Sequence, residues 1–305
     1  MLLLIDAGNT RIKIGWLNPA TGEREPAPVA AELNQLANLI TALEAAFSGK
    51  GSPSAALGVS SAGQHTMHEL DQRLSQAFGV QTHWAGSCRY AAGLYSRYDP
   101  PEQLGADRWA GMLGMMQHLR ASKPDTTSNG TTAIAPVMLV SFGTATTIDT
   151  IYAAKGDTTP DFSSPLPSHA RAVFAGGLIL PGIQLMLHSL ASGTARLPLA
   201  NGATAAFPTH THEAIMTGVL AAQTGAVLRQ WHQCLERFGI APYVVCTGGG
   251  WNAVHQELQA MLLQAQEHFH QSRCPALWSP NPVLDGLAHL AGHLPLPAKK
   301  RPESI

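Results

Sequence analysis

The chain contains one uncommon pattern twice: an apolar strand that runs into a glycine turn and returns at once as a second strand. The first copy, LLLIDAGNTRIKIG, occupies residues 2–15, and the second, VMLVSFGTATTIDTI, occupies residues 137–151. Strand-forming residues on both sides of a short glycine turn are typical of a β-hairpin. Two such openings, far apart in the chain, predict two structurally related halves.

Helical and strand-like segments alternate through the rest of the chain, which indicates an α/β protein. In residues 32–47, for example, leucines and other apolar residues recur at spacings of three and four. Further strands are expected near 55–60 and 80–84. Further helices are expected near 65–78, 104–119, 212–238 and 282–293, and both 174–190 and 241–254 are expected to hold a strand followed by a helix.

Polar stretches rich in Pro, Ser, Thr and Gly suggest where the halves divide. The sequence predicts an N-terminal domain over 1–122, a linker over 123–136 and a C-terminal domain over 137–295. A surface insertion is expected over 156–169 and a loose tail over 296–305.

Composition excludes several classes of function. The chain has 305 residues and a formal net charge of −1, so it lacks the basic excess of a nucleic-acid-binding protein. It has no run of about 18 apolar residues, so no membrane helix is expected. Its four cysteines lack C-x-x-C spacing, and Asp6 interrupts any signal-peptide core. These features predict a soluble cytoplasmic protein with reduced thiols.

The first hairpin joins a carboxylate, Asp6, to the turn Gly8-Asn9-Thr10. A glycine turn can present backbone N–H groups and a hydroxyl to an anion, and a nearby carboxylate can hold Mg²⁺ directly or through water. The pattern therefore predicts a site for a metal and a phosphate. The alternative is an ordinary hairpin in which Asp6 is only a turn residue.

The second hairpin and a later glycine run favour the phosphate interpretation. Residues 143–147 form a second hydroxyl-rich turn, and two such turns can hold a polyphosphate from two sides. The run Thr247-Gly248-Gly249-Gly250 follows a strand and precedes a helix, so an adenosine can lie against its bare backbone. This run does not match the G-x-G-x-x-G fingerprint of dinucleotide sites.

These glycine motifs resemble those of the superfamily that contains acetate kinase, sugar kinases, heat-shock chaperones and actin. Within it, the chain is similar to type III pantothenate kinases. The segments that carry the resemblance are YDPPEQLGADRWAG (98–111), GTATTID (143–149), GGLILPG (176–182), GTARLP (193–198) and LDGLAHL (284–290). The resemblance implies two ribonuclease-H-like (actin-like ATPase) domains related by duplication, with mixed sheets flanked by helices.

The resemblance also implies a homodimeric kinase that transfers phosphate from ATP, with Mg²⁺, to pantothenate in the first step of coenzyme A synthesis. Asp107 would accept the proton of the substrate hydroxyl, and Asp6 would hold Mg²⁺ through water. The ATP-binding residues would be Asp6, Ala7, Gly8, Asn9, Thr10, Arg11, Ile12, Lys13 and Thr144. The pantothenate-binding residues would be Tyr98, Gly105, Ala106, Asp107, Arg108 and Thr194.

The chemistry of the residues at 107 and 108 agrees with these roles. Phosphoryl transfer passes through a loose transition state, so it needs positioning and charge compensation more than a strong base. Arg108 is suited to pairing with an anionic substrate. The alternative for this pair is an acid at a helix start followed by a solvated arginine.

One position departs from the family pattern. The family carries an aspartate two residues before the glycine of the second hairpin, where it binds potassium or another monovalent cation, and this chain has Ser141 there. A hydroxyl is a weaker cation ligand than a carboxylate, so no monovalent-cation requirement is expected. Asp149 stays open between a role near the metal and a turn position. Trp16, Trp84 and Trp251 are candidates for stacking on an adenine, but a place in the core or at its rim is expected for them.

Two other functions remain open from the sequence. The chain can be another small-molecule kinase of the same superfamily, with the same ATP turns and a different acceptor. It can also be a regulatory protein that binds ATP without turnover, an interpretation that only Ser141 favours.

Overall fold

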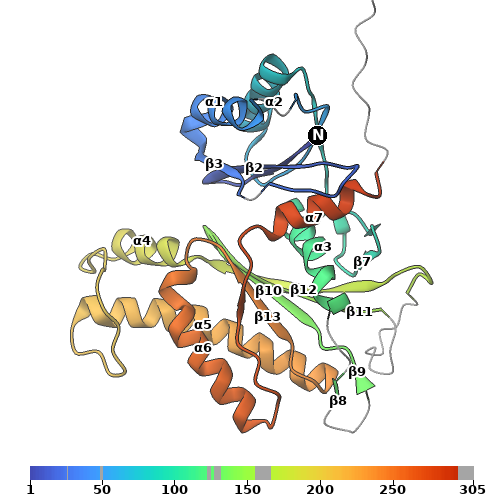
Figure 1. Ribbon diagram of the computed structural model, residues 1–305. Helices are drawn as coiled ribbons and strands as arrows, with labels where there is room; N and C mark the ends of the chain where they lie inside the picture. The colour runs from blue at the N-terminus through green and yellow to red at the C-terminus, as the bar shows by residue number, and fades with distance from the viewer. Residues whose placement is uncertain (26, 49–50, 122–124, 127–131, 155–165, 295–305) are drawn as a thin grey trace, which may run out of the picture. The chain divides into compact units, whose positions relative to one another are not determined.

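The computed structural model describes the chain except for residues 26, 49–50, 122–124, 127–131, 155–165 and 295–305 (Figure 1). The chain forms two compact units. Unit 1 contains Met1–Ala92, Tyr98–Gly114 and Asn281–Ile305, and unit 2 contains Gly93–Arg97 and Met115–Pro280.

Unit 1 is built on a five-stranded mixed sheet with the strand order β3-β2-β1-β4-β5. The first hairpin forms its centre, where β1 pairs with β2 in antiparallel and with β4 in parallel orientation. β3 pairs antiparallel to β2, and β5 pairs parallel to β4. The strands are β1 (Leu2–Ala7), β2 (Arg11–Leu17), β3 (Val29–Glu32), β4 (Ala55–Ser60) and β5 (Thr82–Trp84).

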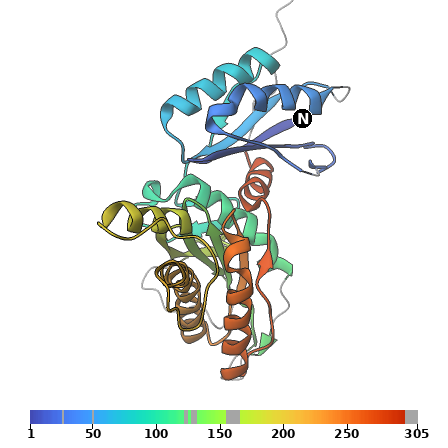
Figure 2. The same cartoon turned by 90° about the vertical axis from the view of Figure 1, so that its left-hand side faces the viewer.

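Helices cover both faces of this sheet. α1 (Leu36–Phe47) and α2 (Gln64–Phe78) lie side by side over one face (Figures 1 and 2). The start of α3 (Ala106–Ala121) and α7 (Pro282–Ala291) pack on the other face. Short 3-10 helices at Leu33–Gln35 and Pro101–Gln103 precede α1 and α3.

The alternation of side chains along β1 determines where Asp6 lies. Leu3, Ile5 and Ala7 pack with α1 and α2, whereas Leu2 and Leu4 pack with α3 and α7. Successive strand side chains point to opposite faces, so Asp6 belongs to the face of Leu2 and Leu4. The carboxylate is thereby on the side that α3 and α7 cover.

α3 and α7 approach each other so closely that their glycines are required. A Cβ atom at Gly286 would overlap the carbonyl oxygen of Ala110, and one at Gly114 would overlap that of Pro282. Leu284 and Leu287 of α7 are fully buried in the same cluster. The LDGLAHL motif therefore seats α7 against the first turns of α3.

The sheet of unit 2 has the strand order β14-β13-β10-β11-β12-β7. β10 pairs antiparallel with β11 and parallel with β13, while β12 is antiparallel to β11 and β14 parallel to β13. β7 extends the sheet beyond β12 in parallel orientation. The strands are β7 (Leu94–Ser96), β10 (Val137–Phe142), β11 (Ala145–Ala153), β12 (Ala172–Pro181), β13 (Tyr243–Thr247) and β14 (Leu277–Trp278); the short β6 (Tyr90–Ala91) precedes β7 in the chain.

Three helices pack with this sheet around the largest core cluster of the unit (Figures 1 and 2). They are α4 (Ile183–Gly193), α5 (Thr211–Phe238) and α6 (Trp251–His268). Met138, Val140 and Phe142 of β10 face this cluster, so Leu139 and Ser141 belong to the opposite face.

The two sheets share one topology. The central strand is β1 in unit 1 and β10 in unit 2. On one side of it, two successive strand pairings are antiparallel, and on the other side two successive pairings are parallel. This agreement in order and direction supports the duplication expected from the two hairpins. The predicted fold class, α/β with mixed sheets flanked by helices, is confirmed.

Several details differ from the sequence-based expectations. The helix expected from 104 begins at Ala106, because 101–103 form a 3-10 turn and Leu104 is extended. Within the expected linker, β8 (Asp125–Thr126) and β9 (Thr132–Ala133) pair with each other. Most of the insertion at 156–169 and all of the tail at 296–305 lie outside the described residues.

The predicted domain bounds, 1–122 and 137–295, stay a prediction. The compact units differ from them at Gly93–Arg97, in the part of α3 from Met115 and at α7. This helix belongs to unit 1 because its apolar face packs against β1 and α3. Among the described residues, no helix combines the length and apolar character needed to cross a membrane.

Candidate functional site

The first glycine turn presents a polar tip on a buried hairpin. The N–H of Gly8 donates to the carbonyl of Arg11 over 3.1 Å, which closes the turn. Asn9, Thr10 and Arg11 are exposed, whereas the side chains of Ala7 and Ile12 are buried. Only the backbone of the last two residues is therefore available to a ligand.

Behind this tip, Asp6 and Lys13 are direct cross-strand partners. The ammonium of Lys13 donates to Oδ1 of Asn281 over 3.2 Å, and Asn281 is the residue that precedes α7. Sequence analysis did not single out Asn281, since nothing local in its segment points to a distant lysine. This contact connects the turn to α7 within unit 1.

Asp6 and Asp107 interact electrostatically. Burial raises the pKa of Asp6 from 3.8 to about 6, the charge of Lys13 lowers it, and the charge of Asp107 raises it further. Asp107 lies in the first turn of α3, where its Oδ1 accepts the N–H of Arg108 over 2.8 Å. The structure thus brings Asp6, at the end of β1, and Asp107, in the GADR segment, close enough to interact, although they are 101 positions apart in the chain.

Arg108 is buried at 8% exposure, with its guanidinium carbon 5.8 Å from the ring centroid of Tyr98. This arrangement is a cation–π contact. Arg89 supports the same segment by donating to the Tyr98 carbonyl and to Asp99 Oδ1, each over 2.9 Å. The alternative of a solvated arginine at 108 is therefore wrong.

In unit 2, three glycine segments meet through their backbones. The N–H of Gly182, before α4, donates to the carbonyl of Thr144 over 3.0 Å, and the N–H of Gly250 donates to that of Phe142 over 3.0 Å. Gly248 has φ +95°, and a Cβ atom there would overlap the Phe142 carbonyl oxygen. Only glycine accommodates this conformation and this approach, so the second turn and the TGGG run form one continuous backbone surface.

A buried glutamine connects the second hairpin to the end of β12. The hydroxyl of Thr146 donates to Oε1 of Gln223, and Nε2 of Gln223 donates to the carbonyl of Pro181 over 2.9 Å. Gln223 is fully buried in α5. In the sequence, Gln223 stands among mostly apolar residues on the buried side of this helix. That pattern could have identified it, but it was not used to predict a role.

The remaining predicted residues of unit 2 have local roles in the structure. Thr194 is exposed at the end of α4, where its hydroxyl donates to the Leu190 carbonyl over 2.9 Å and accepts the N–H of Leu197 over 3.2 Å. The other five predicted pantothenate residues lie in unit 1. Ser141 occupies the position in β10 that Asp6 occupies in β1. Asp149, at 1% exposure, pairs with Leu139 and so shares the face of Ser141.

The donor chemistry of Asp6 and Asp107 fits a magnesium ion. Mg²⁺ is commonly held by one or two carboxylates, with substrate phosphates and water completing its six ligands. Two interacting carboxylates also favour a divalent cation, which relieves their repulsion. Across the described part of the chain, His, Cys, Asp and Glu form no group of three or more placed to hold a metal without such help.

Comparisons with known proteins identify the family of this chain. The sequence profile of the type III pantothenate kinase family matches residues 2–157 and 169–233. A type III pantothenate kinase of Bordetella bronchiseptica is 40% identical over 96% of this chain and 98% of its own length. That of Bordetella petrii is 42% identical over 95% of this chain and 97% of its own.

Other matches are less similar to the chain. The type III pantothenate kinase of Leptothrix cholodnii is 34% identical over 81% of this chain and 85% of its own length. Among solved structures, a Baf family protein of Campylobacter jejuni is 16% identical over 94% of this chain and 96% of that one, with a TM-score of 0.49. The profile match and the two Bordetella relatives establish that this chain belongs to the type III pantothenate kinase family.

Proposed function

We propose that the protein phosphorylates pantothenate from ATP to give 4′-phosphopantothenate, the first step of coenzyme A synthesis. The observation that carries the proposal is the electrostatic interaction of Asp6 with Asp107 on one face of the unit 1 sheet. It supports the proposal because the residue expected beside the ATP phosphates interacts with the residue expected beside the acceptor hydroxyl. A phosphoryl transfer needs these two groups together.

ATP binding is assigned to the glycine turns. In unit 1, the exposed tip Asn9-Thr10-Arg11 and the backbone from Asp6 to Lys13 would hold phosphate oxygens. In unit 2, Thr144 would contact phosphate, and the Gly248–Gly250 surface would lie against the adenosine. Backbone N–H groups in such turns suit anions.

Asp107 would accept the proton of pantothenate's primary hydroxyl while that oxygen bonds to the γ-phosphorus. The bond from the γ-phosphorus to the β–γ bridging oxygen breaks in the same transfer, and ADP leaves. Arg108, oriented by Tyr98, would pair with the pantothenate carboxylate. Gly105 and Ala106 would line the pocket beside them, and Thr194, in unit 2, is a further proposed pantothenate-binding residue.

Asp6 would hold Mg²⁺, which proteins commonly bind through only one or two carboxylates. When bound, the ion supplies charge compensation for the phosphates. We further propose a cytoplasmic location, which the four free thiols of the chain support because disulfides are rare in reducing compartments.

A panel of acceptors tests the proposed function against another kinase of the superfamily. Purified protein with ATP and Mg²⁺ is incubated with pantothenate and, separately, with acetate, with sugars and with other small hydroxyl compounds. We expect transfer to pantothenate and none to the others. Transfer to another acceptor in place of pantothenate would assign the chain to a different kinase.

Activity is expected to change less than about twofold when potassium or ammonium replaces sodium. The reason is Ser141, whose hydroxyl is a weaker ligand than the family's carboxylate. Initial rates at constant ionic strength measure this directly. Introducing the family residue, Ser141→Asp, should create a potassium response, and strong activation of the unmodified protein by potassium would contradict the prediction.

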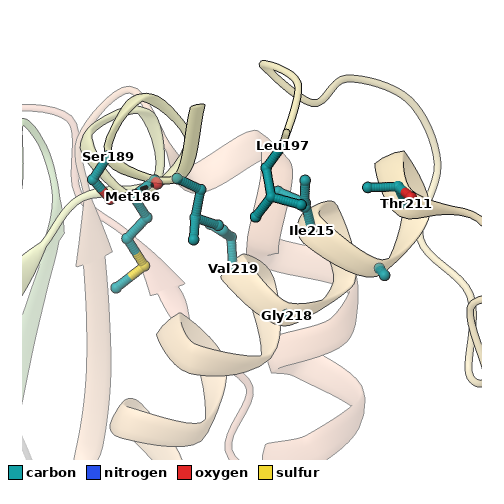
Figure 3. A pocket seen from close by; sticks show the side chains of 9 residues that line it. Met186, Ser189, Leu197, Thr211, Ile215, Gly218 and Val219 are labelled. Carbon is teal, nitrogen blue, oxygen red and sulfur yellow. Dashed lines mark hydrogen bonds between the residues drawn. The ribbon is translucent and has the colours of Figure 1, made fainter. Parts of the chain in front are cut away.

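We also propose a homodimer, and unit 2 offers an apolar surface for it. Large side chains are exposed on β12, α4 and the segment before α5: Ile179, Leu185, Leu199 and Phe207, the last at 91% exposure. Next to them, α4 and α5 line a cavity of about 550 Å³, into which Met186, Ile215, Val219 and Leu197 point (Figure 3). Apolar patches of this kind mark protein interfaces.

Leu185→Glu is expected to shift the protein from dimer to monomer, because a charge would be buried in the interface. Size-exclusion chromatography with light scattering measures the mass at several concentrations. Leu277→Glu is the matched control, since Leu277 is similarly exposed at 40% but lies on β14. A monomeric wild-type protein, or a Leu185→Glu variant that stays dimeric, would contradict this assignment.

A further inference from the structure

Two tryptophans stack beside the glycine surface of unit 2. The ring centroids of Trp251 and Trp278 are 6.0 Å apart and their planes differ by 21°. Trp251 is the first residue of α6, directly after Gly250, and Trp278 is the last residue of β14. The sequence alone does not connect them, because a two-residue strand such as β14 leaves no periodic pattern that would place Trp278 beside α6.

Both rings lie at the edge of the sheet where ligands bind in α/β folds. Trp278 is the register partner of Cys246 on the parallel strand β13, two residues before Gly248. The N–H of Ser279 donates to the Cys246 carbonyl over 2.9 Å, which holds this end of β14 against β13. Crevices beyond the carboxyl ends of parallel strands are the usual ligand sites of such sheets.

The two rings differ in how firmly they are held. Trp251 is half-buried, packs against the main core cluster and lies 6.4 Å from the ring of Phe142, the residue before the second turn. Trp278 is 48% exposed. One ring thus connects the stack to both glycine segments, while the other offers a large aromatic surface to solvent.

We propose that Trp251 and Trp278 form the platform on which the base of the nucleotide stacks, with Trp278 supplying the contact surface. This inference rests on the proposed function and extends it from the phosphates and adenosine backbone to the base itself. A pre-stacked pair of rings loses little freedom on binding, and stacking of a base on an aromatic ring contributes about 1–3 kcal/mol.

Trp278→Ala is expected to raise the KM for ATP about 5- to 150-fold, which is the stacking contribution expressed as affinity. The KM for pantothenate should stay within about twofold. A purine has a larger face than a pyrimidine, so the variant should lose more with ATP than with UTP. Trp278→Phe keeps an aromatic face and should retain most of the wild-type affinity.

Leu277→Ala is the matched control, because Leu277 is also exposed and precedes Trp278 on the same two-residue strand. Calorimetric binding of a non-hydrolysable ATP analogue to the full-length variants, without pantothenate, gives a second readout. It separates the two proposals: a wild type that binds the analogue but leaves pantothenate unphosphorylated contradicts the function and still permits the comparison of affinities.

An unchanged analogue affinity in Trp278→Ala would overturn the platform. So would an equal loss in Leu277→Ala, which would indicate a general disturbance of β14, or a Trp278→Phe variant as weak as Trp278→Ala. Thermal unfolding of each variant confirms that it is folded before its affinity is compared.

Discussion

Asp107→Asn is expected to lower kcat for pantothenate phosphorylation by about 10²- to 10⁴-fold, the usual effect of losing a general base. The amide keeps the size of the side chain and cannot accept the hydroxyl proton. Asp107 lies in the first turn of α3, interacts electrostatically with Asp6 and is not part of the glycine turns. Affinity for ATP should therefore stay within about threefold, measured by calorimetry.

Glu102→Gln is the matched control for this variant. Glu102 is an exposed carboxylate in the same segment, outside the proposed site, and its loss should leave kcat within about twofold. An Asp107→Asn protein that keeps more than a tenth of wild-type kcat would remove Asp107 from the role of proton acceptor. A wild-type protein that binds ATP without turnover would favour a regulatory function instead.

Asp6→Asn is expected to remove most of the activity and to stabilise the fold at the same time. The pKa of Asp6 is about 6 in the folded protein, against 3.8 for an ordinary aspartate. The folded state therefore binds the proton more tightly than the unfolded state does. This contribution to stability is fully present below pH 3.8 and is lost as the pH rises through about 6.

At pH 8 the ionised Asp6 thus destabilises the folded protein, and a neutral asparagine of the same size removes that penalty. The gain in unfolding free energy should be roughly 1–3 kcal/mol at pH 8 and should vanish below pH 4. Urea unfolding at both pH values, without nucleotide or Mg²⁺, measures it. Asp71→Asn is the control, because Asp71 accepts from Trp84 away from the turn.

The same variant should lose at least about 100-fold in kcat/KM, because the amide cannot supply a charged ligand for Mg²⁺. In the wild-type protein, kcat/KM should rise as the pH increases through about 6, as Asp6 loses its proton. Greater instability of Asp6→Asn at pH 8, or near-normal activity, would show that Asp6 is a structural turn residue.

The sequence was sufficient for the two hairpins and for the duplication that they indicate, because a hairpin is encoded by neighbouring residues. Both glycine-turn segments form hairpins, and the first strand of each hairpin has a parallel neighbour on its other side. The place of α7 was not predictable in this way. Its packing depends on Gly286 meeting Ala110, a contact between residues 176 positions apart. β7 and β14 also escaped prediction, since strands of two or three residues carry no periodicity.

The residues of the candidate site also fall into two groups, those that the sequence identified and those that only the structure revealed. Asp6, Asp107 and Arg108 stood in recognisable motifs, and the structure brings them together in unit 1. Gln223, Asn281 and Trp278 act through contacts with distant residues, so no motif identified them. The alternative that Arg108 is a solvated side chain was excluded only by the structure, in which Arg108 is buried.

The most direct test of the account is mass spectrometry of a reaction that contains purified protein, ATP, Mg²⁺ and pantothenate. We expect a product one phosphoryl group heavier than pantothenate, formed in equal amount to ADP and absent with Asp107→Asn. A wild-type protein that binds ATP but yields no phosphorylated pantothenate would contradict the central claim.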